Sequence, residues 1–196
     1  MAWIIVGLGN PGEEYTNTRH NTGRMAVQYF AKKQELPAWK EDKKSNSLTA
    51  GATMGKTIVA LVLPNTFMNK SGTAVAKFVK SMKAAESMVV VYDDLDLPVG
   101  KMKISFDRGS GGHKGIESIA RAVKTKRFVR VRIGISPETS GGKLRKPSGE
   151  KEVNDFILGR FRDTDMKDLT HVFKEVAIAI ECIIRDGREI AMNRFN

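Results

Sequence analysis

The feature that most constrains this chain is the alternation of short β-rich runs with helical periodicity along its 196 residues. Strands that are joined through helices favour a parallel or mixed sheet with helices on both faces. The turn at 54–56 joins two strands directly and predicts a hairpin, so we expect a mixed sheet. The prediction is an α/β fold with a single domain over residues 1–196, in which a twisted mixed sheet lies between helices in three αβα layers. Strands are predicted at 3–6, 48–54, 57–63, 88–92, 101–106 and 128–135, and helices at 22–33, 71–82, 115–124 and 166–186.

One segment, residues 136–152, shows neither periodicity. It is rich in Gly, Ser, Pro and Lys, which is typical of loops, and we expect a mobile basic loop within the domain. The helix predicted after it carries one apolar stripe. Cys182 lies beside this stripe and is interpreted as a small packed residue, whereas His171 falls off it and is expected to be solvated.

The cellular location follows from several weak signals. The longest apolar runs, 58–63 and 88–92, are far shorter than the roughly 20 residues of a membrane helix. Residues 1–6 read as a strand and not as a signal peptide. Cys182 is the only cysteine, which excludes an internal disulfide and suits a reducing compartment. We expect a cytoplasmic protein without a membrane partner.

The charge points to a polyanionic partner. Lys and Arg number 33 against 22 acids, which gives a net charge of +11. A basic balance of this size is typical of proteins that bind nucleic acid or an anionic surface. No acid occurs between positions 118 and 137, and we expect a basic surface that meets phosphates there, formed by Arg121, Lys124, Lys126, Arg127, Arg130 and Arg132.

Residues 7–12, Gly-Leu-Gly-Asn-Pro-Gly, match the G-x-G-x-x-G pattern of dinucleotide-binding folds. In those folds the pattern opens into a helix whose N-terminus holds pyrophosphate, but here a proline, a glycine and two glutamates follow. The pattern therefore favours a tight turn that aims Asn10 into a cleft. The alternative is that Asn10 only caps the turn.

Two histidines lie in polar, glycine-containing segments, where functional residues are common. His20 is the candidate general base, with helix capping as the alternative, and His113 follows a glycine pair. Asn69 lies between a predicted strand and a helix for which Ser71 is the expected N-cap. The Asn69 amide could donate a hydrogen bond to an oxyanion. The alternative is that Asn69 is a second capping residue of the same helix.

Three carboxylates, Asp93, Asp94 and Asp96, follow a buried strand. They are compatible with a Mg²⁺ or Mn²⁺ site, or with one carboxylate that orients a histidine. No P-loop lysine motif accompanies them, which favours the second interpretation. A glycine-rich segment at 109–115, next to a predicted helix N-terminus, suits an anionic group.

Five of these segments together resemble the bacterial peptidyl-tRNA hydrolase family in order and spacing. They are residues 7–15, Thr-Arg-His-Asn with Gly23 at 18–23, Thr-Phe-Met-Asn with Ser-Gly at 66–72, residues 93–98, and Gly-Gly-His at 111–113. The resemblance covers essentially the whole length. It implies an esterase without metal or other cofactor, which frees tRNA from peptidyl-tRNA that stalled ribosomes release prematurely.

The resemblance also assigns roles to residues of this chain. His20 falls on the catalytic histidine and Asp93 on its supporting carboxylate, while Asn69 would bind the ester end and Asn10 would recognise the blocked amide. The tRNA-binding positions are an aromatic pair for the 3' end, a glycine-loop histidine and two phosphate-binding cations: Tyr15, Phe67, His113, Lys103 and Arg132.

One position departs from the family pattern. Lys114 stands where the family usually has Asn after the glycine-loop histidine, and an ammonium cannot accept hydrogen bonds as an amide does. We expect Lys114 to grip a phosphate or the ester carbonyl. The open alternatives are a non-catalytic RNA-binding relative on the same fold and a metal- or nucleotide-dependent enzyme. With +11 of net charge, we expect a monomer without an obligate protein partner.

Overall fold

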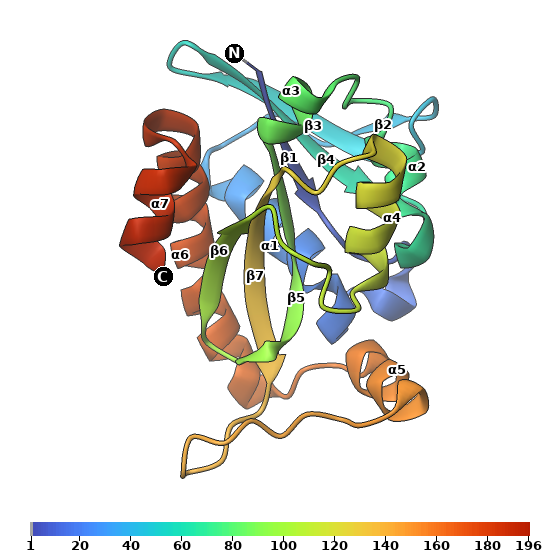
Figure 1. The fold of residues 1–196 in the computed structure, drawn as a ribbon, viewed down its shortest axis with the longest axis vertical. Helices are drawn as coiled ribbons and strands as arrows, with labels where there is room; N and C mark the ends of the chain where they lie inside the picture. The colour runs from blue at the N-terminus through green and yellow to red at the C-terminus, as the bar shows by residue number, and fades with distance from the viewer. Residues whose placement is uncertain (1) are drawn as a thin grey trace.

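A computed structural model describes residues 2–196 and places all its strands in one seven-stranded sheet (Figure 1). The strands are β1 (Ala2–Gly7), β2 (Lys40–Asp42), β3 (Ser47–Met54), β4 (Thr57–Pro64), β5 (Met88–Pro98), β6 (Met102–Phe106) and β7 (Val129–Ser136). Their order is β2-β3-β4-β1-β5-β7-β6. The central strands β4, β1, β5 and β7 are parallel, whereas β2, β3 and β6 pair antiparallel at the edges. The sheet is mixed, as predicted.

Helices cover both faces of this sheet. On one face lie α1 (Thr22–Lys33), α6 (Asp163–Asp186) and α7 (Arg188–Phe195), and on the other α2 (Ser71–Val75), α3 (Met82–Glu86) and α4 (Lys114–Val123). Beyond the ends of β5 and β7 lies α5 (Glu150–Leu158) (Figure 1). Three short 3-10 turns join these elements: η1 (Glu13–Tyr15), η2 (Arg19–Asn21) and η3 (Met68–Lys70). The three-layer α/β fold is confirmed.

The two faces are built by alternation along buried strands. In β1, Ile5 packs into the core under α1 and α6, and its neighbours Ile4 and Val6 pack into the core under α2 and α4. The predicted stripe of α6 is buried together with Cys182, and the His171 side chain is 73% exposed, as expected. No helix within residues 2–196 has the length and apolar character required to cross a membrane.

The helix predicted at 71–82 is wrong in extent. The chain leaves the helix after Val75 and begins α3 at Met82, because the Ser81 hydroxyl accepts a hydrogen bond from the Ala84 N–H and so caps a new helix. Ser71 is also not the N-cap of α2. It is the first helical residue, and its hydroxyl donates to the Met68 carbonyl at 2.8 Å.

The segment predicted as a loop at 136–152 is shorter than expected. Strand β7 includes Ser136, and α5 begins at Glu150, so the irregular part covers 137–149. Its mobility stays a prediction. Strand β5 continues to Pro98, with an irregular register after Asp94. Asp93, Asp94 and Asp96 therefore lie within this strand, whereas we expected them to follow it.

Candidate active site

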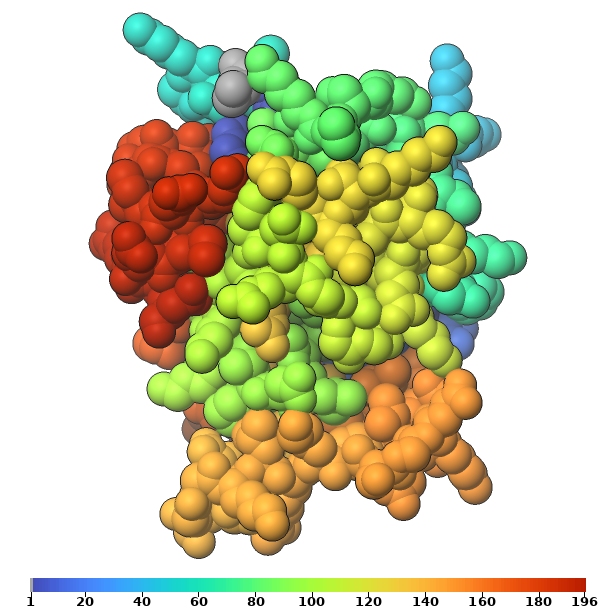
Figure 2. All heavy atoms as spheres, viewed as in Figure 1, coloured from blue at the N-terminus to red at the C-terminus, as the bar shows by residue number. Residues whose placement is uncertain are grey.

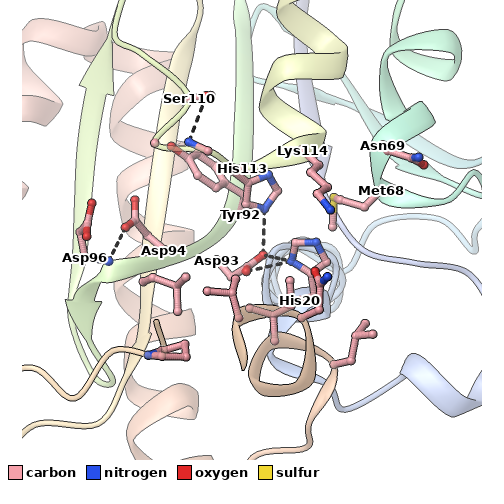
Figure 3. A pocket seen from close by; sticks show the side chains of 18 of the residues that line it. His20, Met68, Asn69, Tyr92, Asp93, Asp94, Asp96, Ser110, His113 and Lys114 are labelled. Atoms are coloured by element: carbon pink, nitrogen blue, oxygen red, sulfur yellow. Dashed lines mark hydrogen bonds and ion pairs between the residues drawn. The ribbon is translucent and has the colours of Figure 1, made fainter. Parts of the chain in front are cut away.

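A cavity of about 510 Å³ lies where the central parallel strands end. The chain pairs β4 with one side of β1 and β5 with the other, and such a switch point opens a crevice at the carboxyl ends of the strands. The walls come from the loops after β1 and β4, from β5, from the start of α4 and from α5. The lining residues include Asn10, His20, Phe67, Met68, Asn69, Tyr92, Asp93, His113 and Lys114 (Figure 3).

His20 reaches the cavity because α1 packs very closely on β5. A Cβ atom on Gly23 would lie 2.1 Å from the Val91 carbonyl oxygen, so only glycine permits this approach. The turn η2, directly before α1, then places the His20 ring beside Asp93. His20 Nδ1 lies 2.9 Å and 3.1 Å from the two carboxylate oxygens, and both residues are buried.

The hydrogen bond to Asp93 defines the tautomer of His20. An ionised carboxylate only accepts hydrogen bonds, so Nδ1 carries the proton and donates it. The Nε2 atom of His20 is therefore left with a free lone pair, and no group within residues 2–196 forms a hydrogen bond with it. This is the arrangement that a general base requires.

His113 donates to the same carboxylate from the other side. Its Nδ1 accepts hydrogen bonds from the Gly115 and Ile116 N–H groups at 3.2 Å and 3.3 Å and so caps α4. The proton therefore lies on Nε2, which is 3.1 Å from Asp93 Oδ1. The Tyr92 ring packs edge-on against the imidazole, with ring centroids 4.8 Å apart. His113 is thus fixed from three directions.

These contacts determine the charge of Asp93. Burial alone would raise the pKa of this carboxyl, but the interactions with His20 and His113 outweigh it and lower the pKa below its ordinary value. Asp93 stays ionised at neutral pH. Burial raises the pKa of the neighbouring Tyr92 to about 12, so its phenol stays neutral.

The same three residues form the one cluster within residues 2–196 that has the composition of a metal site. One ligand atom from each of His20, Asp93 and His113 lies within 4.8 Å of the others. However, the histidine nitrogens that face the carboxylate both carry protons, and a metal needs an unprotonated nitrogen. The hydrogen bonds therefore favour proton handling over metal binding.

Asn10 lines the cavity, and its side chain does not cap its own turn. Its Oδ1 accepts a hydrogen bond from the Met68 N–H at 2.8 Å, which joins the loop after β1 to the loop after β4. The Asn21 amide holds the Asn10 backbone with two further bonds, of 2.8 Å and 3.0 Å. The Met68 N–H holds Oδ1 in place, and the NH₂ of Asn10, which only donates, has no partner within residues 2–196 and so faces a ligand.

The remaining predicted residues of this region lie at the rim. Asn69 is exposed, and its amide lies apart from the histidines, beyond Met68 (Figure 3). Phe67 is 56% exposed and packs edge-on against Tyr15, with ring centroids 6.5 Å apart. Tyr15 itself does not line the cavity, and its contact with the tRNA 3' end stays a prediction. Lys114 is also exposed, and its Nζ donates to Glu150 of α5 at 3.4 Å.

A second cavity of about 380 Å³ adjoins the first and contains the predicted phosphate-binding pair. Lys103 and Arg132 face each other across β6 and β7. The Arg132 guanidinium donates to Asp94 at 2.6 Å, and Lys146 donates to Asp96 at 2.7 Å, so these two acids form ion pairs at the rim.

The prediction that Arg130 belongs to the basic surface is wrong. Arg130 is only 1% exposed, because it points between β7 and the loop before α4, where its Nη1 donates to the Gly109 carbonyl.

Sequence reasoning also missed parts of the site. The backbone N–H of Met68 holds Asn10, and residues of α5 form an apolar wall, among them Val153, Ile157 and Leu158. The signal for α5 was present as apolar residues four apart, but the loop-like composition before it obscured the helix.

A buried histidine–carboxylate pair beside the ends of the central strands of a mixed α/β sheet has the arrangement of an enzyme site that works by general-base catalysis. Comparison with known proteins identifies the family. The family model described as Peptidyl-tRNA hydrolase matches residues 4–196, so the chain belongs to the peptidyl-tRNA hydrolase family. The family expected from the motifs is confirmed.

Named relatives align with nearly the whole chain. The peptidyl-tRNA hydrolase of Chloroflexus aggregans is 40% identical over 99% of this chain and 98% of its own length. That of Alkaliphilus oremlandii is 37% identical over 98% of both. Among solved structures, peptidyl-tRNA hydrolase from Acinetobacter baumannii superposes with a TM-score of 0.88 at 30% identity, covering 100% of this chain and 94% of that one.

Proposed function

We propose that this chain hydrolyses the ester bond between the peptide and the tRNA 3' ribose in peptidyl-tRNA, with His20 as general base. Family membership supports the reaction and the substrate class. The observation that carries the mechanism is the His20–Asp93 contact of 2.9 Å in a cavity that is open to a ligand.

The reaction begins with a water molecule beside His20. The free lone pair on Nε2 takes a proton from the water as its oxygen attacks the ester carbonyl carbon. Asp93 stabilises the imidazolium that forms, since it already accepts the Nδ1 proton. When the bond to the ribose oxygen breaks, the imidazolium returns the proton to that oxygen. The products are a tRNA with a free 3' hydroxyl and a peptide carboxylic acid, which loses its proton to the solvent at neutral pH.

Asn10 distinguishes a substrate with a blocked amino group from one with a free amino group. Its free NH₂ donates to the carbonyl of an N-acylated residue but cannot accept from the ammonium of an unblocked aminoacyl group. Leaving a buried donor unpaired, or facing it with a cation, penalises the unblocked substrate. Asn69 would bind the ester end or its oxyanion from the rim, where its exposed amide has freedom to turn.

Beyond its reacting ester, the tRNA is held at the rim of the catalytic cavity and in the neighbouring Lys103–Arg132 cavity. The exposed face of Phe67, supported by Tyr15, suits stacking of the unpaired terminal adenine. Lys103 and Arg132 would meet phosphates, and His113 would hold Asp93 in place. Such an enzyme recycles tRNA in the cytoplasm, as a monomer, and reads backbone and shape rather than base sequence.

A paired turnover assay tests this function. An N-acetylated aminoacyl-tRNA and its free-amine counterpart are incubated with the protein, with EDTA and in parallel without it, and release of the amino acid from tRNA is followed. We expect cleavage of the acetylated substrate alone. If neither substrate is cleaved while tRNA still binds, the chain is a non-catalytic RNA-binding relative instead; loss of cleavage in EDTA alone would reveal a metal-dependent enzyme.

A further inference from the structure

Helix α5 forms one wall of the catalytic cavity, yet none of its nine residues is buried. Figure 2 shows this helix and the segment before it as the orange surface at the lower end of the molecule. A helix this short is marginal in water without packing. The position of α5 therefore depends on the contacts that its ends make with the rest of the chain.

Arg19, the residue before His20, contacts the last turn of α5. Its Nη1 donates to the Phe156 carbonyl at 3.2 Å. The guanidinium carbon lies 4.4 Å from the centroid of the Phe156 ring and 5.3 Å from that of the Phe161 ring. A Cβ on Gly159 would lie 2.9 Å from Nη1, so this glycine leaves room for the guanidinium. Two aromatic rings and a carbonyl oxygen thus fix the Arg19 side chain.

The backbone joins the same two segments. The Arg19 N–H donates to the Gly159 carbonyl at 3.0 Å, and Thr18 and Arg160 form an isolated antiparallel bridge. The turn η2, which includes His20, is therefore attached to the residues that directly follow α5.

We propose that Arg19 is a positioning residue, which joins the turn of the catalytic base to α5 so that the base and this cavity wall keep one relative position. The inference rests on the proposed function, since it concerns the site at which the ester is cleaved. Arg19 does not line the cavity, so it acts through two neighbours that do: His20, next in the chain, and Ile157, which follows Phe156. A displacement of about 1 Å in such a site can slow the reaction roughly 100-fold.

The first test compares three variants in single-turnover hydrolysis of N-acetylated aminoacyl-tRNA, below the thermal unfolding transition of each. Arg19→Gln removes the guanidinium, and Arg19→Lys keeps a cation that can still reach the ring. Arg194→Gln is the matched control, because Arg194 is exposed and lies over the Phe195 ring, 5.5 Å from its centroid, away from the cavity.

We expect Arg19→Gln to react at least about tenfold more slowly at saturation, with tRNA affinity unchanged, and Arg19→Lys to recover part of the rate. Arg194→Gln should stay within about twofold of the parent. A merely structural role would lower the unfolding temperature and leave the rate of the folded protein unchanged.

Phe156→Leu tests the partner of Arg19 and leaves the arginine in place, so it also serves if Arg19→Gln does not fold. We expect a rate roughly threefold lower, since only the ring contact is lost. Arg19→Gln/Phe156→Leu should be no slower than Arg19→Gln alone, because the two residues act through one contact.

Hydrogen exchange of the free protein tests the contact without any substrate. We expect the amide protons of residues 153–159 to exchange at least about tenfold faster in Arg19→Gln than in the parent, because the end of α5 then opens more often. Their exchange in Arg194→Gln should match that of the parent.

A saturated rate of Arg19→Gln within about twofold of the parent would overturn the proposal, and so would unchanged exchange in residues 153–159. An equal loss of rate in Arg194→Gln would overturn it as well, since the effect would then not depend on α5. Failure of the proposed function shows differently: the parent would cleave no ester, while the exchange of α5 would still respond to Arg19→Gln.

Discussion

The Nδ1 atom of His20 lies 2.9 Å from a carboxylate oxygen of Asp93, although 73 positions separate the two residues in the sequence. The contact depends on the close packing of α1 against β5 at Gly23. It leaves the opposite ring nitrogen free to accept a proton in the cavity. The proposed reaction therefore depends on the hydrogen bonds around one carboxylate.

Asp93→Asn should reverse the tautomer of His20. His113 is locked with its proton on Nε2 by the α4 cap, so it takes the single amide oxygen, and the amide NH₂ then donates to His20 Nδ1. The proton of His20 moves to Nε2, which can no longer act as a base. We expect kcat to fall by roughly 10²- to 10⁴-fold with KM little changed. A loss below tenfold in steady-state hydrolysis would argue against this role.

Asn10→Asp should weaken the selection for blocked substrates. The carboxylate can still accept the Met68 N–H, but in place of the NH₂ donor it presents a second oxygen that attracts an ammonium. We expect the ratio of kcat/KM for acetylated over free aminoacyl-tRNA to fall by at least about tenfold. Parallel assays of both substrates measure the ratio, and an unchanged ratio would remove Asn10 from the selection.

Tyr92 should ionise late. Its pKa is raised to about 12, so the folded protein holds the phenol proton more tightly than the unfolded chain, whose value is 10.0. The stabilisation is complete below about pH 10 and is lost as the pH rises through about 12. An ultraviolet titration of tyrosinate should show a component near pH 12 that Tyr92→Phe removes. Its persistence in that variant would assign the late ionisation to another group.

Gly23→Ala should destabilise the fold and disturb the His20–Asp93 contact together. The added Cβ would lie 2.1 Å from the Val91 carbonyl oxygen, which belongs to the centre of the sheet and has no room to move. We expect a loss of about 2–3 kcal/mol in urea unfolding. Gly109→Ala is the matched control, because a Cβ there meets nothing within 4 Å, and its loss should stay below about 0.5 kcal/mol. Similar losses in both variants would contradict the packing argument.

The sequence predicted well where pattern and long-range packing agree. Helix α1 was predicted with its observed bounds, and most strands to within a few residues, because their apolar periodicity is strong. Helices α3, α5 and α7 and the short strand β2 were missed. Helix α3 has only five residues, and α7 has a single buried residue and shows no apolar stripe. Helix α5 turns its apolar side toward a ligand cavity instead of the core. None of these three helices therefore has the pattern of an ordinary core helix.

The candidate site was predicted by residue type but not by contact. His20, Asp93, Asn10 and His113 do line one cavity, yet no pattern in the chain indicated that Asp93 would accept hydrogen bonds from both imidazole rings. Arg130 was placed on the surface because alternate strand residues share a face, and that face is covered here by the loop before α4. Side-chain alternation predicts the face of a residue, whereas its burial depends on which loop covers that face.

Single-turnover hydrolysis of N-acetylated aminoacyl-tRNA by His20→Gln, with enzyme in excess over substrate, tests whether His20 is the general base. Saturation removes binding from the measured rate, and a separate titration with labelled tRNA confirms that the variant still binds. We expect a rate lower by roughly 10²- to 10⁴-fold, with tRNA affinity unchanged. A rate within tenfold of the parent at full binding would show that His20 is not the base.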